Sequence, residues 1–246
     1  MALRLHAGEK PPDPNLVPPT AAFDTAARAA GDRPIQAACG PGTGMYGTGD
    51  VGFFDRIAPL YDLAMPPADG DALAAGFDRA TRPIDRLLDV GGGSGRAAAA
   101  VTGPDRLVVD VSRPMLRRAR TVRGLSAVAG DAGRLPVADG AVDAVLVVDA
   151  FHHLPTQTAA IDEAARVLAP GGVFVIREFD PTHPLGRLLV AAEHAIGMGS
   201  RFRSPDDLAA ALDASAFDAV VIDRGFGYTV AGVRGDAGDS EHSFGR

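Results

Sequence analysis

The stretch LLDVGGGSG at residues 87–95 leaves this chain few folds to adopt. Its apolar run is typical of a strand buried on both faces of a parallel sheet. The glycines at 91, 92, 93 and 95 then allow a tight backbone turn that can pass close to a ligand. Such a loop fits either the pyrophosphate of a dinucleotide or a ligand without one, so the rest of the chain has to decide.

Buried strands alternate with helices after this loop. Runs rich in valine and leucine predict the strands, and the segments between them have helical spacing. Two last strands, 217–222 and 227–233, are expected to form a hairpin. The alternation predicts an α/β protein whose mostly parallel sheet lies between two layers of helices. The earlier strands are expected at 86–91, 106–110, 125–129, 142–149 and 172–178, and the helices between them at 94–101, 113–122 and 157–168.

The two ends of the chain differ from this core. Residues 1–44 are rich in proline and end in CGPGTG, so we expect a disordered extension there. Residues 45–235 are expected to form one domain, and the polar residues 236–246 a flexible tail. Met45 directly precedes the first residues expected to be ordered, and we hypothesise that it is the true start.

Composition narrows the classes of function. The net charge of −7 argues against non-specific binding to nucleic acid or to an anionic membrane. The apolar runs are too short to span a membrane, and the first residues lack a secretory signal, so we expect a cytoplasmic protein. Cys39 is the only cysteine, which excludes an intramolecular disulfide and a metal site built from several cysteines.

A short apolar stripe precedes the core. Phe53, Phe54, Ile57 and Tyr61 recur at helical spacing within 53–67. The helix that they predict could simply cover the edge of the sheet. It could instead form a lid over a cofactor, with Tyr61 facing the pocket. The sequence leaves both interpretations open.

The glycine loop departs from the dinucleotide pattern. A G-x-G-x-x-G loop needs its third glycine where the helix packs closely on the strand. Counted from Gly91, that position holds Arg96. The spacing Gly91-x-Gly93-x-Gly95 therefore favours a ligand that has no pyrophosphate, although a plain glycine turn would also fit.

Two acidic residues beyond the loop point to a nucleoside. Asp110 ends the second strand, where a carboxylate can accept hydrogen bonds from both hydroxyls of a ribose. Asp131 and Ala132 follow the third strand, where they could meet the edge of an adenine. Asp131 could equally be a turn-forming residue.

Five segments follow one another in register: LLDVGGGSG, VVDVSRPML, GDAGRLP, VDAVLVVDAFHHL and RVLAPGGVFVIREF. Together they resemble the class I S-adenosylmethionine-dependent methyltransferases. The resemblance implies a Rossmann-like three-layer sandwich with a seven-stranded, mostly parallel sheet whose last strand is antiparallel. It also implies S-adenosyl-L-methionine as the cofactor and a small molecule as the methyl acceptor.

The same resemblance implies which residues bind the cofactor. The glycine loop would line its methionine part, and the acid after the second strand would hold its ribose. The GDA segment would meet its adenine, and the acid after the fourth strand would lie near its amino-acid end. Asp89 is interpreted as a carboxylate that orients the loop. In that order the cofactor-binding residues are Gly91, Gly93, Ser94 and Gly95; Asp110; Asp131 and Ala132; and Asp149.

Three further segments are similar to the ubiquinone and menaquinone C-methyltransferases: FFDRIAPLYD, REFDPTHP and the stretch 201–235. This similarity implies C-methylation of a quinone precursor. The chain departs from that group after the fourth strand, where His152-His153-Leu154 replaces an Arg-Asn pair. That ending is common among other small-molecule members, so O- or N-methylation of another small molecule stays open.

The two adjacent histidines are the candidate catalytic residues. They lie at the carboxyl end of a central strand, where open α/β sheets bind their ligands. We hypothesise that one of them, preferably His153 rather than His152, faces the acceptor as a base or an orienting group. A purely structural histidine fits equally well. Adjacent histidines lack the i,i+4 spacing of metal ligands, so no metal site is expected. Glu178 could reach the acceptor or pair with Arg177 or Arg201.

Two other classes of function stay in view. A nicotinamide oxidoreductase is disfavoured because the chain has no Tyr-x-x-x-Lys, its single lysine being Lys10. A catalytically silent binding protein would keep the fold without turnover. The intact glycine loop with Asp110 and Asp131 argues that cofactor binding is retained.

Overall fold

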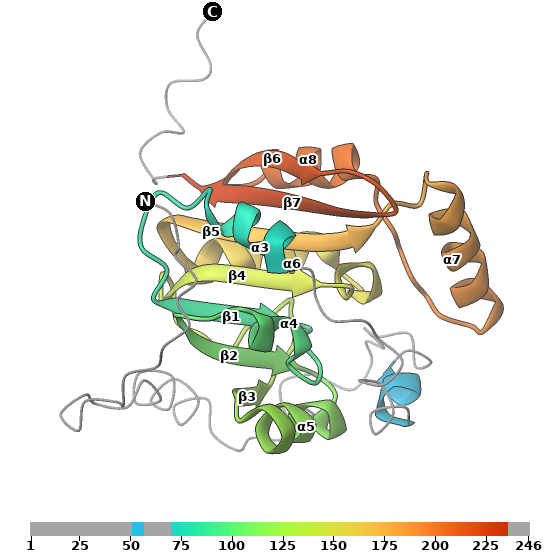
Figure 1. Ribbon diagram of the computed structural model, residues 1–246, viewed down its shortest axis with the longest axis horizontal. Helices are drawn as coiled ribbons and strands as arrows, with labels where there is room; N and C mark the ends of the chain where they lie inside the picture. Colours follow the sequence, from blue (N-terminus) through green and yellow to red (C-terminus); the bar gives the residue numbers. More distant parts are fainter. Residues whose placement is uncertain (1–50, 57–69, 236–246) are drawn as a thin grey trace, which may run out of the picture.

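The computed structural model describes residues 51–56 and 70–235 (Figure 1). The expected extension, Met45, Tyr61 and the expected tail lie outside the described residues. Of the helix expected over 53–67, the described part is helical and spans 51–56.

A seven-stranded sheet forms the middle of the molecule (Figure 1). The first five strands are parallel to one another, whereas β7 is antiparallel to both of its neighbours, β5 and β6. The predicted α/β class, the mostly parallel sheet and its antiparallel last strand are therefore confirmed. In the order β3-β2-β1-β4-β5-β7-β6, the strands are Ser126–Ala129, Asp105–Asp110, Arg86–Val90, Val142–Val148, Leu168–Phe179, Gly227–Arg234 and Phe217–Asp223.

Alternate strand residues bury their side chains against two helical layers. Leu87 and Ala144 pack with Leu73 of α3 on one face, while Leu88 and Val145 pack with residues of α6 and α8 on the other. The helices α4 and α5 join the first face through a smaller apolar cluster. The helices in these layers are α3 (Gly70–Phe77), α4 (Arg96–Ala100), α5 (Arg113–Arg123), α6 (Gln157–Val167) and α8 (Pro205–Asp213).

Two helices begin at serine caps. The Oγ atom of Ser112 accepts a hydrogen bond from the backbone N–H of Met115 at the start of α5. Ser204 does the same for Asp207 at the start of α8. Each cap satisfies a backbone donor that the helix itself leaves unpaired.

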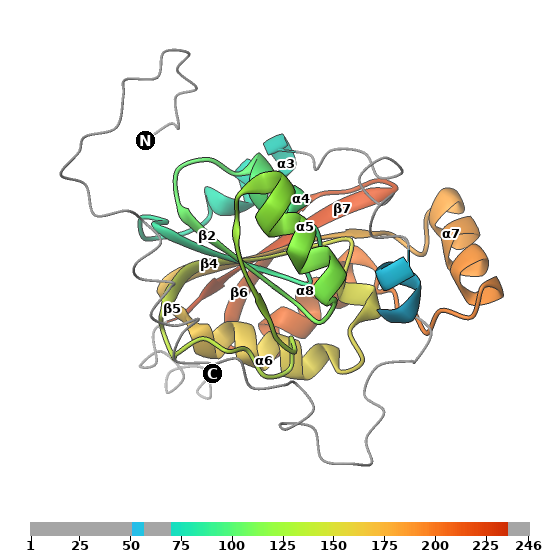
Figure 2. The same cartoon turned by 90° about the horizontal axis from the view of Figure 1, so that it is seen from below.

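The helix α7 (Pro184–Ala195) stands outside both layers, beyond the carboxyl ends of β4 and β5 (Figures 1 and 2). Gly186 is its only buried residue. A Cβ atom at that position would lie 1.8 Å from the carbonyl oxygen of Asp180, so the helix can fold back on the preceding loop only with glycine there. Across the described ranges, no helix is both long and apolar enough to cross a membrane.

Candidate active site

A cavity lies at the carboxyl ends of the central parallel strands, where ligands of open α/β sheets bind. It encloses about 840 Å³ of empty space, part of it open to solvent. Segments far apart in the sequence form its walls: the helical residues 51–56, the glycine loop, the start of α5 and the end of β4. The lining residues are Val51, Phe54, Asp89, Gly91, Gly92, Gly93, Arg96, Ala97, Asp110, Val111, Ser112, Met115, Val148, Asp149, Ala150, His153 and Leu154.

The buried carboxylate of Asp89 underlies the glycine loop. Its Oδ2 atom accepts a hydrogen bond from the backbone N–H of Ala98 at 3.1 Å. A Cβ atom on Gly92 would lie 2.5 Å from the carboxylate, so only glycine leaves room for it. Burial raises the pKa of Asp89 to about 7, against the lowering effect of the Ala98 hydrogen bond. These contacts fit the orienting role expected from the sequence.

Asp110 joins the loop to the start of α5. Its Oδ2 atom accepts from the N–H of Gly93 at 2.8 Å, and its Oδ1 atom accepts from the N–H of Ser112 at 2.7 Å. Burial raises the pKa of Asp110, although these two hydrogen bonds favour the charged form. The carboxylate is thereby held at the cavity wall in a fixed orientation.

Asp149 faces the glycine loop from the end of β4. Its Oδ2 atom lies 3.0 Å from Nη2 of Arg96, and both side chains are largely buried. Asp149 has a φ of 53°, a left-handed conformation in which non-glycine residues are strained. Burial and the nearby Glu178 raise its pKa, while Arg96 lowers it. Arg96, which stands where a dinucleotide loop has its third glycine, thus forms an ion pair with Asp149 in the cavity wall.

Four of the expected cofactor residues do not line this cavity. Ser94 is buried, and Gly95 packs closely against Leu125. Asp131 and Ala132 line a second hollow of about 420 Å³. Its wall shares Leu154 with the first cavity, so the two spaces are neighbours. The carboxylate of Asp131 accepts a hydrogen bond from the N–H of Gly133 at 2.8 Å, which is the turn-forming contact.

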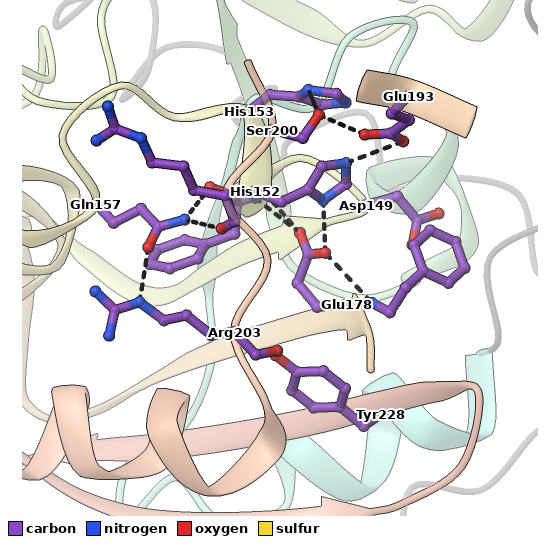
Figure 3. Close-up of polar contacts among 12 residues, drawn as sticks. Asp149, His152, His153, Gln157, Glu178, Glu193, Ser200, Arg203 and Tyr228 are labelled. Carbon is purple, nitrogen blue, oxygen red and sulfur yellow. Dashed lines mark hydrogen bonds and ion pairs between the residues drawn. The ribbon is translucent and has the colours of Figure 1, made fainter. Parts of the chain in front are cut away.

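The two histidines lie on a 3-10 turn, η2 (Phe151–His153), and point to different places (Figure 3). His153 lines the cavity, whereas His152 is 2% exposed and faces the protein interior. The Nδ1 atom of His152 lies 2.6 Å from Oε2 of Glu178, and its ring stacks on Phe202 with centroids 4.1 Å apart. Glu178 therefore pairs with His152 and with neither of the arginines considered from the sequence.

His153 lies in the cavity wall beside Phe54. Its ring meets Phe54 edge-to-face, with centroids 5.0 Å apart, and its Nδ1 atom lies 3.4 Å from Oγ of Ser200. Burial and the neighbouring His152 lower the pKa of His153 to about 3. The imidazole is therefore neutral at physiological pH and can offer a lone pair to a ligand.

Residues 88–176 match the protein-family model described as a methyltransferase domain. This segment of the chain is similar to that family of domains. The matched segment runs from β1 to β5 and includes the glycine loop, Asp110, Asp149 and both histidines. The resemblance stated from the sequence is thus supported by the part of the chain that builds most of the cavity.

Relatives with curated names agree on methyl transfer but differ in the acceptor. The chain is 37% identical over 142 residues to a demethylmenaquinone methyltransferase of Beutenbergia cavernae, covering 52% of this chain and 57% of that protein. It is 35% identical over 142 residues to a malonyl-[acyl-carrier protein] O-methyltransferase of Methylococcus capsulatus, covering 54% of this chain and 50% of that protein. The chain thus spans about half the length of these relatives.

A solved structure shares the fold of the methyltransferase domain. It is a SAM-dependent methyltransferase of Thermotoga maritima, described as a possible histamine N-methyltransferase. The TM-score is 0.62 at 21% identity, and the match covers 74% of this chain and 99% of that one. At this identity the likeness shows the fold.

The helix α7 and the loop after it lie outside the matched segment. They contribute two polar side chains near the histidines that the sequence does not predict, Glu193 and Ser200. The hydroxyl of Ser200 donates to the carboxylate of Glu193, and Oε1 of Glu193 lies 3.7 Å from Nε2 of His152 (Figure 3). Neither residue lies in a recognisable motif. Their position depends on the path of α7, which the local sequence does not specify.

Proposed function

We propose that this protein is an S-adenosylmethionine-dependent methyltransferase that methylates a small molecule, with a quinone precursor as the acceptor and carbon as the methylated atom. The observation that carries the proposal is the carboxylate of Asp110, held by Gly93 and Ser112 at the wall of a cavity at the carboxyl ends of the strands. The position and fixed orientation of this carboxylate suit the two hydroxyls of a ribose. The quinone acceptor rests on the name of the Beutenbergia cavernae relative.

The ion pair beyond the loop suits the other end of the cofactor. Methionine carries an ammonium and a carboxylate on one carbon. Asp149 could accept hydrogen bonds from the ammonium, and the guanidinium of Arg96 could donate to the carboxylate. In this proposal Gly91 and Gly93 lie along the methionine chain, while Asp131 and Ala132 meet the adenine from the neighbouring hollow.

Methyl transfer from a sulfonium is an in-line displacement with a good leaving group, so the protein mainly aligns the two reactants and excludes water. Phe54 and Leu154 provide an apolar wall beside the reaction site. His153 is neutral at physiological pH, so it would accept a hydrogen bond from a hydroxyl of the acceptor and orient it. Because the pKa of His153 is so low, we favour orientation of the acceptor over proton abstraction for this residue.

A second candidate is O-methylation of a different small molecule. The malonyl-[acyl-carrier protein] O-methyltransferase of Methylococcus capsulatus is nearly as similar in identity and in aligned length. The proposal includes a cytoplasmic setting, and the net charge of −7 disfavours nucleic acid as a partner.

Calorimetric titration with S-adenosylhomocysteine and, separately, with NAD tests the proposal. We expect binding of S-adenosylhomocysteine and none of NAD. Binding of NAD alone would overturn the proposal in favour of an oxidoreductase, and binding of neither would favour a catalytically silent module. Incubation with cofactor carrying a ¹³C-labelled methyl group and a demethylated quinone analogue, followed by NMR of the product, then distinguishes a C-methyl from an O-methyl group by its chemical shift.

A further inference from the structure

Three groups capable of binding a metal converge beside the cavity. His152 and His153 come from the turn after β4, and Glu193 comes from α7 (Figure 3). One ligand atom from each of the three residues lies within 4.8 Å of the other two. No local motif predicts this group, because Glu193 reaches the histidines only through the fold of α7.

The separation of these groups is wide for a hydrogen bond and suitable for a shared ion. The Nε2 atom of His152 lies 3.7 Å from Oε1 of Glu193. Hydrogen bonds between nitrogen and oxygen are about 2.7–3.2 Å long. Two ligands at about 2.1 Å from a tetrahedral zinc ion are about 3.4 Å apart. In the described part of the chain, this buried Nε2 atom has no hydrogen-bond partner.

The other nitrogen of His152 has the environment of a metal-ligating histidine. Its Nδ1 atom lies 2.6 Å from the carboxylate of Glu178. Metal-ligating histidines commonly donate their second ring N–H to a carboxylate, which fixes the tautomer and leaves the lone pair on the ligating nitrogen. Stacking on Phe202 holds the ring in this orientation. The lone pair of Nε2 would therefore point toward Glu193.

We propose that His152, His153 and Glu193 form a binding site for a divalent cation of the zinc class. Two imidazoles and one carboxylate are a ligand set that zinc uses in catalytic sites, where a fourth position stays open. The hydroxyl of Ser200, which donates to Glu193, holds that carboxylate in place.

The open position of this site would face the acceptor. His153 lines the same cavity as the glycine loop and Asp110, so an ion bound to it lies at the edge of the space proposed for methyl transfer. An oxygen of the acceptor would occupy the fourth position, so the ion would orient the acceptor in place of a direct hydrogen bond to His153. This assignment, which rests on the proposed function, restricts the acceptor to molecules with a phenolic, enolic or carboxylate oxygen near the methylated atom.

Zinc binding by the full-length, untagged protein tests the site. The protein is stripped with a chelator, desalted and titrated with Zn²⁺ in competition with a chromophoric chelator. We expect one tightly bound ion per chain and at least tenfold weaker binding in Glu193→Ala, since a lost ligand should cost no less than a lost outer partner. Asp206→Ala, at an exposed ion pair with Arg224, is the control and should bind as the wild type does.

Two further measurements keep the test decisive. Co²⁺ in the same site should give the visible absorption of a four-coordinate ion, and this absorption should be lost in Glu193→Ala. Circular dichroism checks that the variant is folded. Failure of the wild type to retain zinc, or equal affinity in Glu193→Ala, would overturn the metal site. Titration with S-adenosylhomocysteine separates this failure from that of the proposed function, because the cofactor residues do not include Glu193.

Discussion

The Nδ1 atom of His152 lies 2.6 Å from Oε2 of Glu178, and both residues are at most 3% exposed. The Oε1 atom of the same carboxylate accepts from the backbone N–H of Phe151 at 2.7 Å. Glu178 thereby ties the turn η2 to the end of β5. The turn that carries His153 into the cavity wall is thus anchored by a buried carboxylate.

Loss of this carboxylate should destabilise the protein strongly. Glu178→Ala leaves the ring nitrogen of His152 and the N–H of Phe151 buried without an acceptor, so we expect a loss of about 3–5 kcal/mol in the free energy of unfolding. Glu178→Gln keeps an acceptor and should cost less. Urea denaturation measures both. Asp206→Ala, which breaks an exposed ion pair screened by solvent, should change stability far less, and an equal loss in both alanine variants would contradict the argument.

The buried Asp89 should make stability depend on pH. The pKa of this carboxyl is raised from 3.8 to about 7 by burial, so the folded protein binds the proton more tightly than the unfolded chain. Its contribution to the free energy of unfolding is therefore greatest at low pH. It falls as pH rises from about 4 to about 7, by an amount on the order of 4 kcal/mol.

The variant Asp89→Asn isolates this effect. The amide oxygen can still accept from the N–H of Ala98, but the side chain no longer titrates. We expect the variant to resemble the wild type near pH 4 and to be increasingly more stable than it toward pH 8. Urea denaturation across this range measures the difference, and parallel curves for the two proteins would show that Asp89 is not responsible.

Most of the sheet could be predicted because its signals are local. Continuous valine and leucine runs mark the parallel strands, and the expected segment 142–149 matches β4 to within a residue. The strand β5 begins four residues before the expected 172, since Leu168 already pairs with Val142. Its PGG sequence looks like a turn, and only the neighbouring strand shows that pairing starts earlier.

The site could be predicted only where it lies at strand ends. Asp110 and Asp149 follow β2 and β4, so parallel topology alone brings them to one edge of the sheet. Glu193 and Ser200 reach the histidines through the path of α7, which depends on the tight contact between Gly186 and Asp180. Arg96 departs visibly from the glycine pattern of a dinucleotide loop. Its pairing with Asp149 is a tertiary contact, and no local sequence signal predicts it.

Asp110 should dominate cofactor affinity. Hydrogen bonds to a charged group contribute about 1.5–3 kcal/mol, so Asp110→Ala should weaken binding of S-adenosylhomocysteine by roughly 10- to 100-fold. Calorimetric titration measures the change. Asp105→Asn, at the opposite end of the same strand, is the matched control and should bind normally. If both variants bound equally well, the ribose would have to be held by another residue.

Gly95 lies where the glycine loop meets the start of α4. Its φ of 79° lies in the left-handed region, and a Cβ atom there would approach Cδ1 of Leu125 to 2.6 Å. A left-handed alanine costs about 1–2 kcal/mol, and displacing Leu125 adds to that, so we expect Gly95→Ala to lose about 1–3 kcal/mol of stability. Binding of S-adenosylhomocysteine should weaken too, because the same loop carries Gly93 and Arg96 along the cavity wall.

Gly70→Ala is the control for the loss of stability and of binding expected in Gly95→Ala. Gly70 begins α3 and has no positive φ, and among the residues that the structure describes a Cβ atom there meets nothing within 4 Å. Alanine at that position should leave stability unchanged or raise it by up to about 1 kcal/mol, since glycine has the lower helix propensity. Urea denaturation and calorimetric titration of both variants decide the matter. If Gly95→Ala matched Gly70→Ala in both measurements, the loop would tolerate a side chain, and its glycines would not be needed to shape the cofactor site.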